Sequence, residues 1–224
     1  MDEDAPSLRF FGIGPCKLPA VLRLPECARG LIVFAHGSGS SHLSKRNNCV
    51  SEHLAEAGFA SLLFDLLTLD EAHDRTKAFD IDLLAARLLD AAIRMRGEPE
   101  VAHLPIGLFG ASTGAGAALL AAAKRPDLVA AIVSRGGRPD LAGAQPLSKV
   151  RCPVQLIIGS ADVEVIALNR AAAKLLECPH EIAIVPNAGH LFEEQGALER
   201  VMSHACRWFE AHLVHGEVEA RQRS

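Results

Sequence analysis

The chain lacks the features by which several large classes of protein are recognised. Its 23 Lys and Arg against 27 Asp and Glu give a formal charge of -4, whereas a nucleic-acid-binding surface is basic. No apolar run is long enough to span a bilayer. The glycines around Ser112 are not followed by the lysine that a phosphate-binding loop carries. We therefore expect no nucleic-acid partner, no membrane partner and no cofactor.

Closely spaced cysteine pairs are missing as well. The segment 1–6 is acidic and has no apolar signal core, which favours a cytoplasmic protein with reduced, mostly buried thiols. The six cysteines are dispersed, as Cys16, Cys27, Cys49, Cys152, Cys178 and Cys206.

His212 and His215 stand near Glu210 at the end of the last expected helix, without a convergent cluster, so we expect a solvated helix end and no metal.

The composition that is present is ordinary for a globular domain. Hydrophobic residues make up 49% and charged residues 22% of the 224 positions. We expect a single domain over residues 1–224, with 1–6 and 216–224 as flexible tails.

Short apolar runs alternate with segments of helical periodicity. A polar stretch between Thr68 and Lys77 indicates a loop, and the short span between 134 and 153 leaves no room for a large cap domain. The alternation predicts an α/β fold, with a mostly parallel sheet of about seven to eight strands and helices on both faces. Strands are expected at 8–13, 18–24, 30–35, 60–64, 104–109, 128–133, 153–158 and 181–185, and helices within 50–57, 81–93, 115–124, 165–176 and 198–213.

The stretch Gly110-Ala111-Ser112-Thr113-Gly114 joins an apolar run to an Ala-rich segment. This order indicates a strand, a sharp turn and a helix, in which the central residue takes a strained backbone and the flanking glycines let the chains pass. The Ser112 hydroxyl is then held at the end of a strand, where the first amides of the helix favour an oxyanion. The alternative is an ordinary turn packed with small residues.

Residues suited to catalysis follow several of the expected strands. Because ligands bind at the carboxyl ends of the strands in such sheets, we expect these residues along one rim. Asp65 among them suits bonding to loop amides, so we expect it to be structural. The set comprises His36, Gly37, Asp65, Ser112, Arg135, Asp162 and His190.

Three of these residues occur in the chain order of an α/β-hydrolase triad: serine, acid, histidine. Ser112 is expected to be the nucleophile and His190 the base that takes its proton and returns it to the leaving group. Asp162 is expected to fix the tautomer of the histidine and stabilise the imidazolium. Glu164 and Asp140 are open alternatives for the acid.

The oxyanion hole is expected to use two backbone amides. Thr113, directly after the nucleophile, supplies one, and Ser38 supplies the other from the loop that follows a buried strand. His36, Gly37 and Gly39 are expected to line the substrate side of this loop, because the glycines let the chain curl close to a ligand. A glycine- and serine-rich surface loop is the alternative.

Two arginines bear on specificity. Arg135 and Arg138 lie at the expected ligand rim, and an arginine fork pairs well with a carboxylate or a phosphate. An acidic or phosphorylated ester is therefore a candidate substrate. The alternative is that both arginines are solvated or pair with Asp140 or Asp162.

Four stretches of the chain resemble a known family. The chain is similar to an α/β hydrolase over nearly its full length, most of all to the dienelactone hydrolase-like group, in a subgroup found alone or fused to phosphoribosyltransferase domains. True dienelactone hydrolases carry a cysteine at the elbow, where this chain has Ser112. The stretches are Leu63-Phe64-Asp65-Leu66-Leu67-Thr68, Gly110-Ala111-Ser112-Thr113-Gly114, Ser134-Arg135-Gly136-Gly137-Arg138-Pro139-Asp140-Leu141-Ala142-Gly143 and Ala188-Gly189-His190-Leu191-Phe192-Glu193-Glu194.

The residues and the resemblance together predict a cytoplasmic serine hydrolase that cleaves a small carboxylic ester or lactone through an acyl-enzyme. Acyl transfer or perhydrolysis with the same triad is an open alternative. So is a non-catalytic module that works beside a phosphoribosyltransferase. The partner is expected to be a small ester or lactone, and a homodimer is left open.

Overall fold

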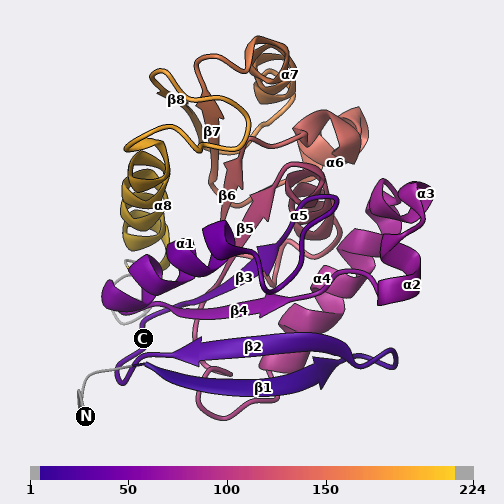
Figure 1. The fold of residues 1–224 in the computed structure, drawn as a ribbon, viewed down its shortest axis with the longest axis vertical. Coiled ribbons are helices and arrows are strands. Elements are labelled where there is room, and N and C mark those ends of the chain that lie inside the picture. Colours follow the sequence, from indigo (N-terminus) through magenta and orange to yellow (C-terminus); the bar gives the residue numbers. More distant parts are fainter. Residues whose placement is uncertain (1–5, 215–224) are drawn as a thin grey trace.

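One sheet forms the centre of the protein. The computed structural model describes residues 6–214, and over this range eight strands lie in the order β1-β2-β4-β3-β5-β6-β7-β8 (Figure 1). β2 is antiparallel to β1 and to β4, and all other neighbours are parallel, which confirms the expected fold class. The strands span Ser7–Ile13 (β1), Leu18–Leu24 (β2), Leu31–Ala35 (β3), Ala60–Phe64 (β4), Ile106–Ala111 (β5), Ala131–Arg135 (β6), Val154–Gly159 (β7) and His180–Val185 (β8).

Helices cover both faces of the sheet (Figure 1). α1 (Lys45–Glu56) and α8 (Ala197–Leu213) bury their apolar sides on one face. The second core, on the other face, includes α4 (Ile81–Met95), α5 (Thr113–Lys124), α6 (Ala144–Lys149) and α7 (Val163–Ala173). Because the central strands β3 to β7 are buried on both faces, their sequences are apolar almost throughout.

The prediction of a loop between Thr68 and Lys77 is wrong. Two short helices occupy it, α2 (Leu69–Ala72) and α3 (Arg75–Ala78). The Thr68 hydroxyl accepts from the Glu71 amide while the Glu71 carboxylate accepts from the Thr68 amide, so a capping box starts the first helix despite its polar sequence.

The sixth strand lies later than expected. It spans Ala131–Arg135 instead of 128–133, because the pairing of Gly107 with Ala131 and of Ala111 with Arg135 sets its register against β5. Arg135 is therefore the last residue of a strand and not part of the following loop. Between β6 and β7 the chain forms a 3-10 turn (Pro139–Ala142) and then α6.

The expectation of mostly buried thiols is also wrong. The cysteines are free, but Cys16 and Cys27 are exposed and only Cys152 and Cys178 are buried. Burial raises the pKa of the Cys152 thiol to about 12. Among residues 6–214, no helix has the length and apolar character needed to cross a membrane. Apart from Pro6, the expected flexible tails lie outside the described residues, as does His215.

Candidate active site

Ser112 stands alone between β5 and α5. Its backbone has φ 50° and ψ -120°, a conformation that residues other than glycine rarely adopt. The Ser112 amide donates to the carbonyl oxygen of Arg135 at 3.3 Å, and its own carbonyl accepts from the amides of Ala115 and Arg138 at 3.0 Å. These bonds clamp the elbow between β6 and the first turn of α5, so the strained conformation is determined by its surroundings.

The glycines around Ser112 make room for this turn. A Cβ atom on Gly110 would lie 2.5 Å from the Cα atom of Ala115, and one on Gly114 would lie 2.6 Å from the carbonyl carbon of Ala35. A Cβ atom on Gly37 would lie 3.0 Å from the Ser112 Cβ atom. The spacing Gly-x-Ser-x-Gly thus reflects close backbone approach on both sides of the nucleophile candidate.

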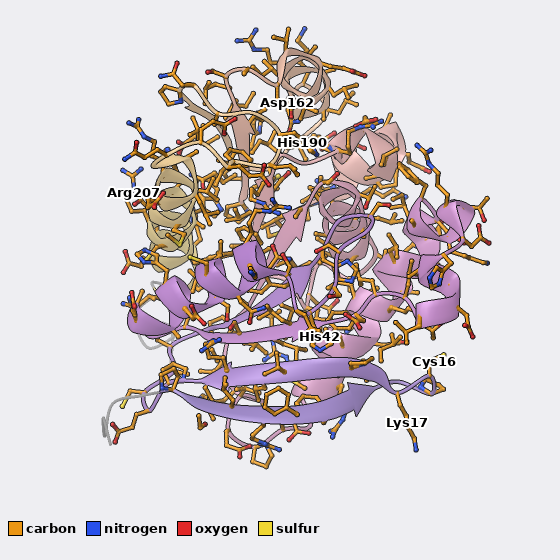
Figure 2. The ribbon with its side chains drawn as sticks, in the orientation of Figure 1. Cys16, Lys17, His42, Asp162, His190 and Arg207 are labelled. Carbon is orange, nitrogen blue, oxygen red and sulfur yellow. The ribbon has the colours of Figure 1, made fainter. Side chains whose placement is uncertain are left out.

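Asp162 and His190 meet at the same edge of the sheet (Figure 2). Nδ1 of His190 lies 2.7 Å from Oδ2 of Asp162, and the side chain of the aspartate is only 14% exposed. Asp162 stands at the N-cap of α7 but makes no side-chain capping bond, so its carboxylate is used on the histidine. Of the alternative acids, Asp140 is taken by Arg138.

The loop after β6 links this pair to Ser112. A Cβ atom on Gly136 would lie 3.6 Å from Cε1 of His190, while the neighbouring Arg135 carbonyl binds the Ser112 amide. In the part of the chain that the structure describes, no hydrogen bond joins the Ser112 hydroxyl to His190. Such bonds are often long without substrate and tighten when it binds.

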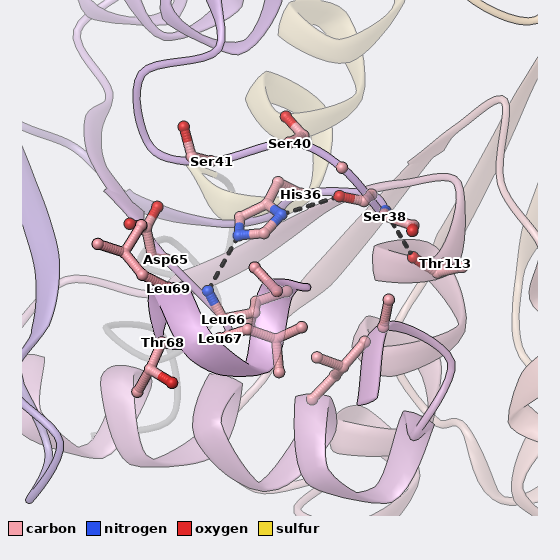
Figure 3. Close-up of a pocket in the computed structure, with 15 residues that line it drawn as sticks. His36, Ser38, Ser40, Ser41, Asp65, Leu66, Leu67, Thr68, Leu69 and Thr113 are labelled. Atoms are coloured by element: carbon pink, nitrogen blue, oxygen red, sulfur yellow. Dashed lines mark hydrogen bonds between the residues drawn. The ribbon is translucent and has the colours of Figure 1, made fainter. Parts of the chain in front are cut away.

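Thr113 links the elbow to the loop after β3 (Figure 3). The Ser38 amide donates to the Thr113 hydroxyl oxygen at 3.1 Å. This amide was expected to be a free donor of the oxyanion hole, but its hydrogen is already used within the protein. The Thr113 amide, at the first position of α5, makes no hydrogen bond within residues 6–214. Its N–H therefore remains available to donate to a ligand.

His36 is used within the protein. Its Nε2 accepts from the Leu66 amide at 2.9 Å, so the proton lies on Nδ1, which donates to the Gly37 carbonyl at 3.0 Å (Figure 3). Burial lowers the pKa of this histidine and favours the neutral ring. His36 therefore shapes the loop and has no free ring nitrogen for a ligand.

Asp65 holds the same loop from the next strand. Its Oδ1 accepts from the backbone amide of His42 at 2.7 Å and lies 2.8 Å from Nδ1 of that residue. This matches its expected structural role. Together with His36, it fixes the loop that carries Gly37, Ser38 and Gly39.

A hollow of about 500 Å³, open mouth included, lies beside Thr113 (Figure 3). The loop after β3 forms one wall, and the other is mostly apolar and built by residues 65–68, which follow β4, and by α2, α3 and α4. Sequence reasoning missed this wall because it expected a loop there. The Thr68-x-x-Glu71 pattern was the signal for a helix. The apolar lining comes from Leu66, Leu67, Leu69, Ala72, Ala78 and Leu84.

The two candidate specificity arginines have different surroundings. Arg138 donates from Nε and Nη2 to both oxygens of Asp140 at 2.8 and 2.7 Å, so its fork is occupied. Arg135 is only 9% exposed and makes no ion pair with a carboxylate among residues 6–214. Burial, and then the charge of Arg46, lowers its pKa to about 10. Arg46, on α1, carried no signal in the sequence, because only the tertiary fold brings it close to β6.

A comparison with family models matches residues 18–213 to the dienelactone hydrolase family. The chain belongs to the dienelactone hydrolase family. The crystal structure of a dienelactone hydrolase from Anabaena variabilis is 47% identical, covers 94% of this chain and 99% of its own, and has a TM-score of 0.88. The protein is thus an α/β hydrolase of this family.

Two further comparisons bear on relatives. Two proteins of Mycobacterium tuberculosis, each named "Putative phosphoribosyl transferase", are 52% identical over 200 residues, which are 89% of this chain and 45% of theirs. The chain thus spans about half the length of these curated relatives. Est1E from Butyrivibrio proteoclasticus is 17% identical with a TM-score of 0.76, over 90% of this chain and 97% of its own, and shares the fold alone.

Proposed function

We propose that this family member is a serine hydrolase that cleaves a small carboxylic ester or lactone through an acyl-enzyme. The observation that carries the proposal is Ser112 at positive φ, at the same sheet edge as the His190–Asp162 pair. In the first step, Ser112 Oγ bonds to the carbonyl carbon and its proton passes to Nε2 of His190. The bond to the leaving alkoxide breaks as His190 returns that proton. A water molecule then attacks the acyl-enzyme in the same way: His190 takes its proton and returns it to Ser112 as the acid is released.

The role of Asp162 follows from its contact. Because its carboxylate lies against Nδ1, the proton of neutral His190 is held on Nδ1 and Nε2 keeps a lone pair for the serine proton. The mostly buried carboxylate also stabilises the imidazolium that forms when the proton arrives. Asp162 thus orients and stabilises the base without taking the proton itself.

The oxyanion donors are proposed to centre on Thr113. Its amide has no acceptor among the described residues, and its hydroxyl accepts from the Ser38 amide. A hydroxyl that accepts from one group can donate its own proton to another. In this arrangement Thr113 supplies two donors, and the Ser38 amide acts through the Thr113 hydroxyl.

The size of the substrate is limited by the walls around the site. Only a 3-10 turn and α6 stand between β6 and β7, where a large cap would be inserted. The hollow beside Thr113 has an apolar lining suited to a short alkyl or aryl group. Est1E, which shares the fold, has been solved with ferulic acid bound, and a ligand of that size is compatible with a hollow of this kind.

The test is covalent labelling with a fluorophosphonate probe, alongside turnover of 4-nitrophenyl acetate. We expect the wild-type protein to be labelled on Ser112 and to turn over the ester, whereas Ser112→Ala does neither. Ser40→Ala, on the half-exposed loop of the same hollow, is the matched control and should still be labelled. Turnover by folded Ser112→Ala would remove this residue from the mechanism. Absence of labelling in the folded wild type would favour a non-catalytic module.

A further inference from the structure

A second hollow lies between α8 and the amino ends of β7 and β8, and we call it the α8 hollow. Gln155 and Glu181, which line it, are the second residues of their strands and pair with each other in the sheet. Asp162 and His190 follow the opposite, carboxyl ends of the same strands, and Figure 2 shows Arg207 on α8 apart from both. The hollow measures about 520 Å³, open mouth included, and is lined by Gln155, Glu181, Arg207, Trp208, Ala211 and His212.

The α8 hollow has a strand wall and a helix wall. Ile157 and Ala183, two residues after Gln155 and Glu181, pack in the core that α8 covers. Because side chains alternate along a strand, Gln155 and Glu181 point to this same face. The helix wall is one side of α8, where residues three to four positions apart are neighbours; it consists of Arg207, Trp208, Ala211 and His212.

Two deeply buried side chains of the α8 hollow lack hydrogen-bond partners. Gln155 is 3% and Trp208 9% exposed, and neither Oε1 of the glutamine nor Nε1 of the tryptophan is bonded. Buried polar groups nearly always have a partner, and leaving one unpaired costs stability. Because a terminal carboxamide turns readily about its last torsion, the Gln155 group can meet a ligand in the hollow. We infer that the missing partner comes from outside the chain.

Two opposite charges stand on the facing walls without pairing. Among residues 6–214, Glu181 forms no ion pair, and Arg207 bonds only to the Ser203 carbonyl at 3.3 Å and to Nδ1 of His204 at 3.2 Å. Both charges act on the same ring: after burial, Arg207 lowers the pKa of His204 and Glu181 raises it. The carboxylate and the guanidinium are therefore close to each other but beyond ion-pair distance.

We propose that the α8 hollow binds a small zwitterion, an amino acid with a free ammonium and a free carboxylate. The strand wall supplies acceptors, the Glu181 carboxylate for the ammonium and the Gln155 carbonyl beside it. The helix wall supplies donors, the Arg207 guanidinium for the carboxylate and the Trp208 indole N–H. The site goes beyond the proposed hydrolase and uses none of the residues assigned to it.

The first experiment uses the fluorescence of Trp208, which is the one tryptophan of the sequence and therefore reports this hollow directly. Glycine, β-alanine and γ-aminobutyrate, whose charges are spaced differently, are titrated against the full chain. We expect a saturable change in emission and a higher melting temperature with at least one of them. The methyl ester and the N-acetyl form of that amino acid, each lacking one charge, should bind at least about tenfold more weakly.

The second experiment assigns each charge of the ligand to its partner. Arg207→Gln should weaken binding of the amino acid about tenfold but have little further effect on its methyl ester, which has lost the carboxylate. Glu181→Gln should show the same pattern with the N-acetyl form. Arg200→Gln, at another exposed position of α8, is the matched control and should keep wild-type affinity.

Replacement of the buried carboxamide tests the floor of the hollow. Gln155→Met should weaken binding, yet it should melt no lower than the wild type because it removes an unpaired polar group. If this variant does not fold, the variants at Glu181 and Arg207 still test the proposal, since both positions are exposed.

Three results would overturn the zwitterion site. These are no change in emission or melting temperature with any of the three amino acids, equal affinity for the amino acid and its singly charged forms, or an equal loss in Arg200→Gln and Arg207→Gln. Ser112→Ala should bind the amino acid as tightly as the wild type. Failure of the proposed hydrolase would therefore leave this test intact.

Discussion

Replacing Ser112 by glycine should make the protein more stable while abolishing its activity. Ser112 has φ 50° and ψ -120°, a backbone conformation that glycine adopts without strain and that is strained for a residue with a side chain. The bonds from its amide and carbonyl to Arg135, Ala115 and Arg138 hold it there. The proposed nucleophile is thus held in place at a cost in stability that the glycine variant should recover.

The size of the gain follows from two opposing effects. Strain of this kind costs about 1–3 kcal/mol, and glycine loses about 0.5–1 kcal/mol more than alanine through the entropy of the unfolded chain. The net gain over Ser112→Ala should be about 1 kcal/mol, which in a chain of 224 residues corresponds to a melting temperature higher by about 2–4 °C.

The assay is thermal unfolding of Ser112→Gly against Ser112→Ala. Both lack the hydroxyl and should be inactive toward 4-nitrophenyl acetate, so any difference in melting reports the backbone and not a ligand. A glycine variant that melts at or below the alanine variant would refute the idea that the elbow stores strain.

Two further predictions concern the neighbours of the site. Thr113→Val removes the hydroxyl that accepts from the Ser38 amide and should lower kcat by about 10²-fold with little change in KM. Thr113→Ser should retain most of the activity, and an unimpaired valine variant would exclude the hydroxyl as an oxyanion donor. The hydrogen bond from Arg87 lowers the pKa of Glu71 from 4.5 to about 2, so its stabilisation is present above pH 4.5 and is lost as the pH falls toward 2. Glu71→Gln should therefore reduce the free energy of unfolding near pH 7 by about 1 kcal/mol, and a difference that persists at pH 2 would contradict this origin.

Much of the framework could be predicted from the sequence because it depends on local pattern. Buried parallel strands are apolar throughout, so β3, β4 and β5 stand out as runs, and the glycines at 110 and 114 mark the turn between β5 and α5. Once the sheet is parallel, residues after its strands share one edge. That rule brings Ser112, Asp162 and His190 to one rim before any coordinates are known.

The rest could not be predicted because it depends on which distant groups become partners. Arg138 pairs with Asp140, two residues away, a pairing that the sequence could only leave open. Only the fold buries Arg135 and brings Arg46 close enough to lower its pKa. Likewise, the bond between Ser38 and Thr113 forms where β3 and β5 lie side by side.

The sequence by itself thus determined the fold class, the elbow and the chain order of the proposed nucleophile, acid and base, since periodicity and glycine spacing act over a few residues. The tertiary structure decided which donors are free and which charge is unpaired. Those properties depend on burial and on the pairing of groups far apart in the chain, which no short stretch contains.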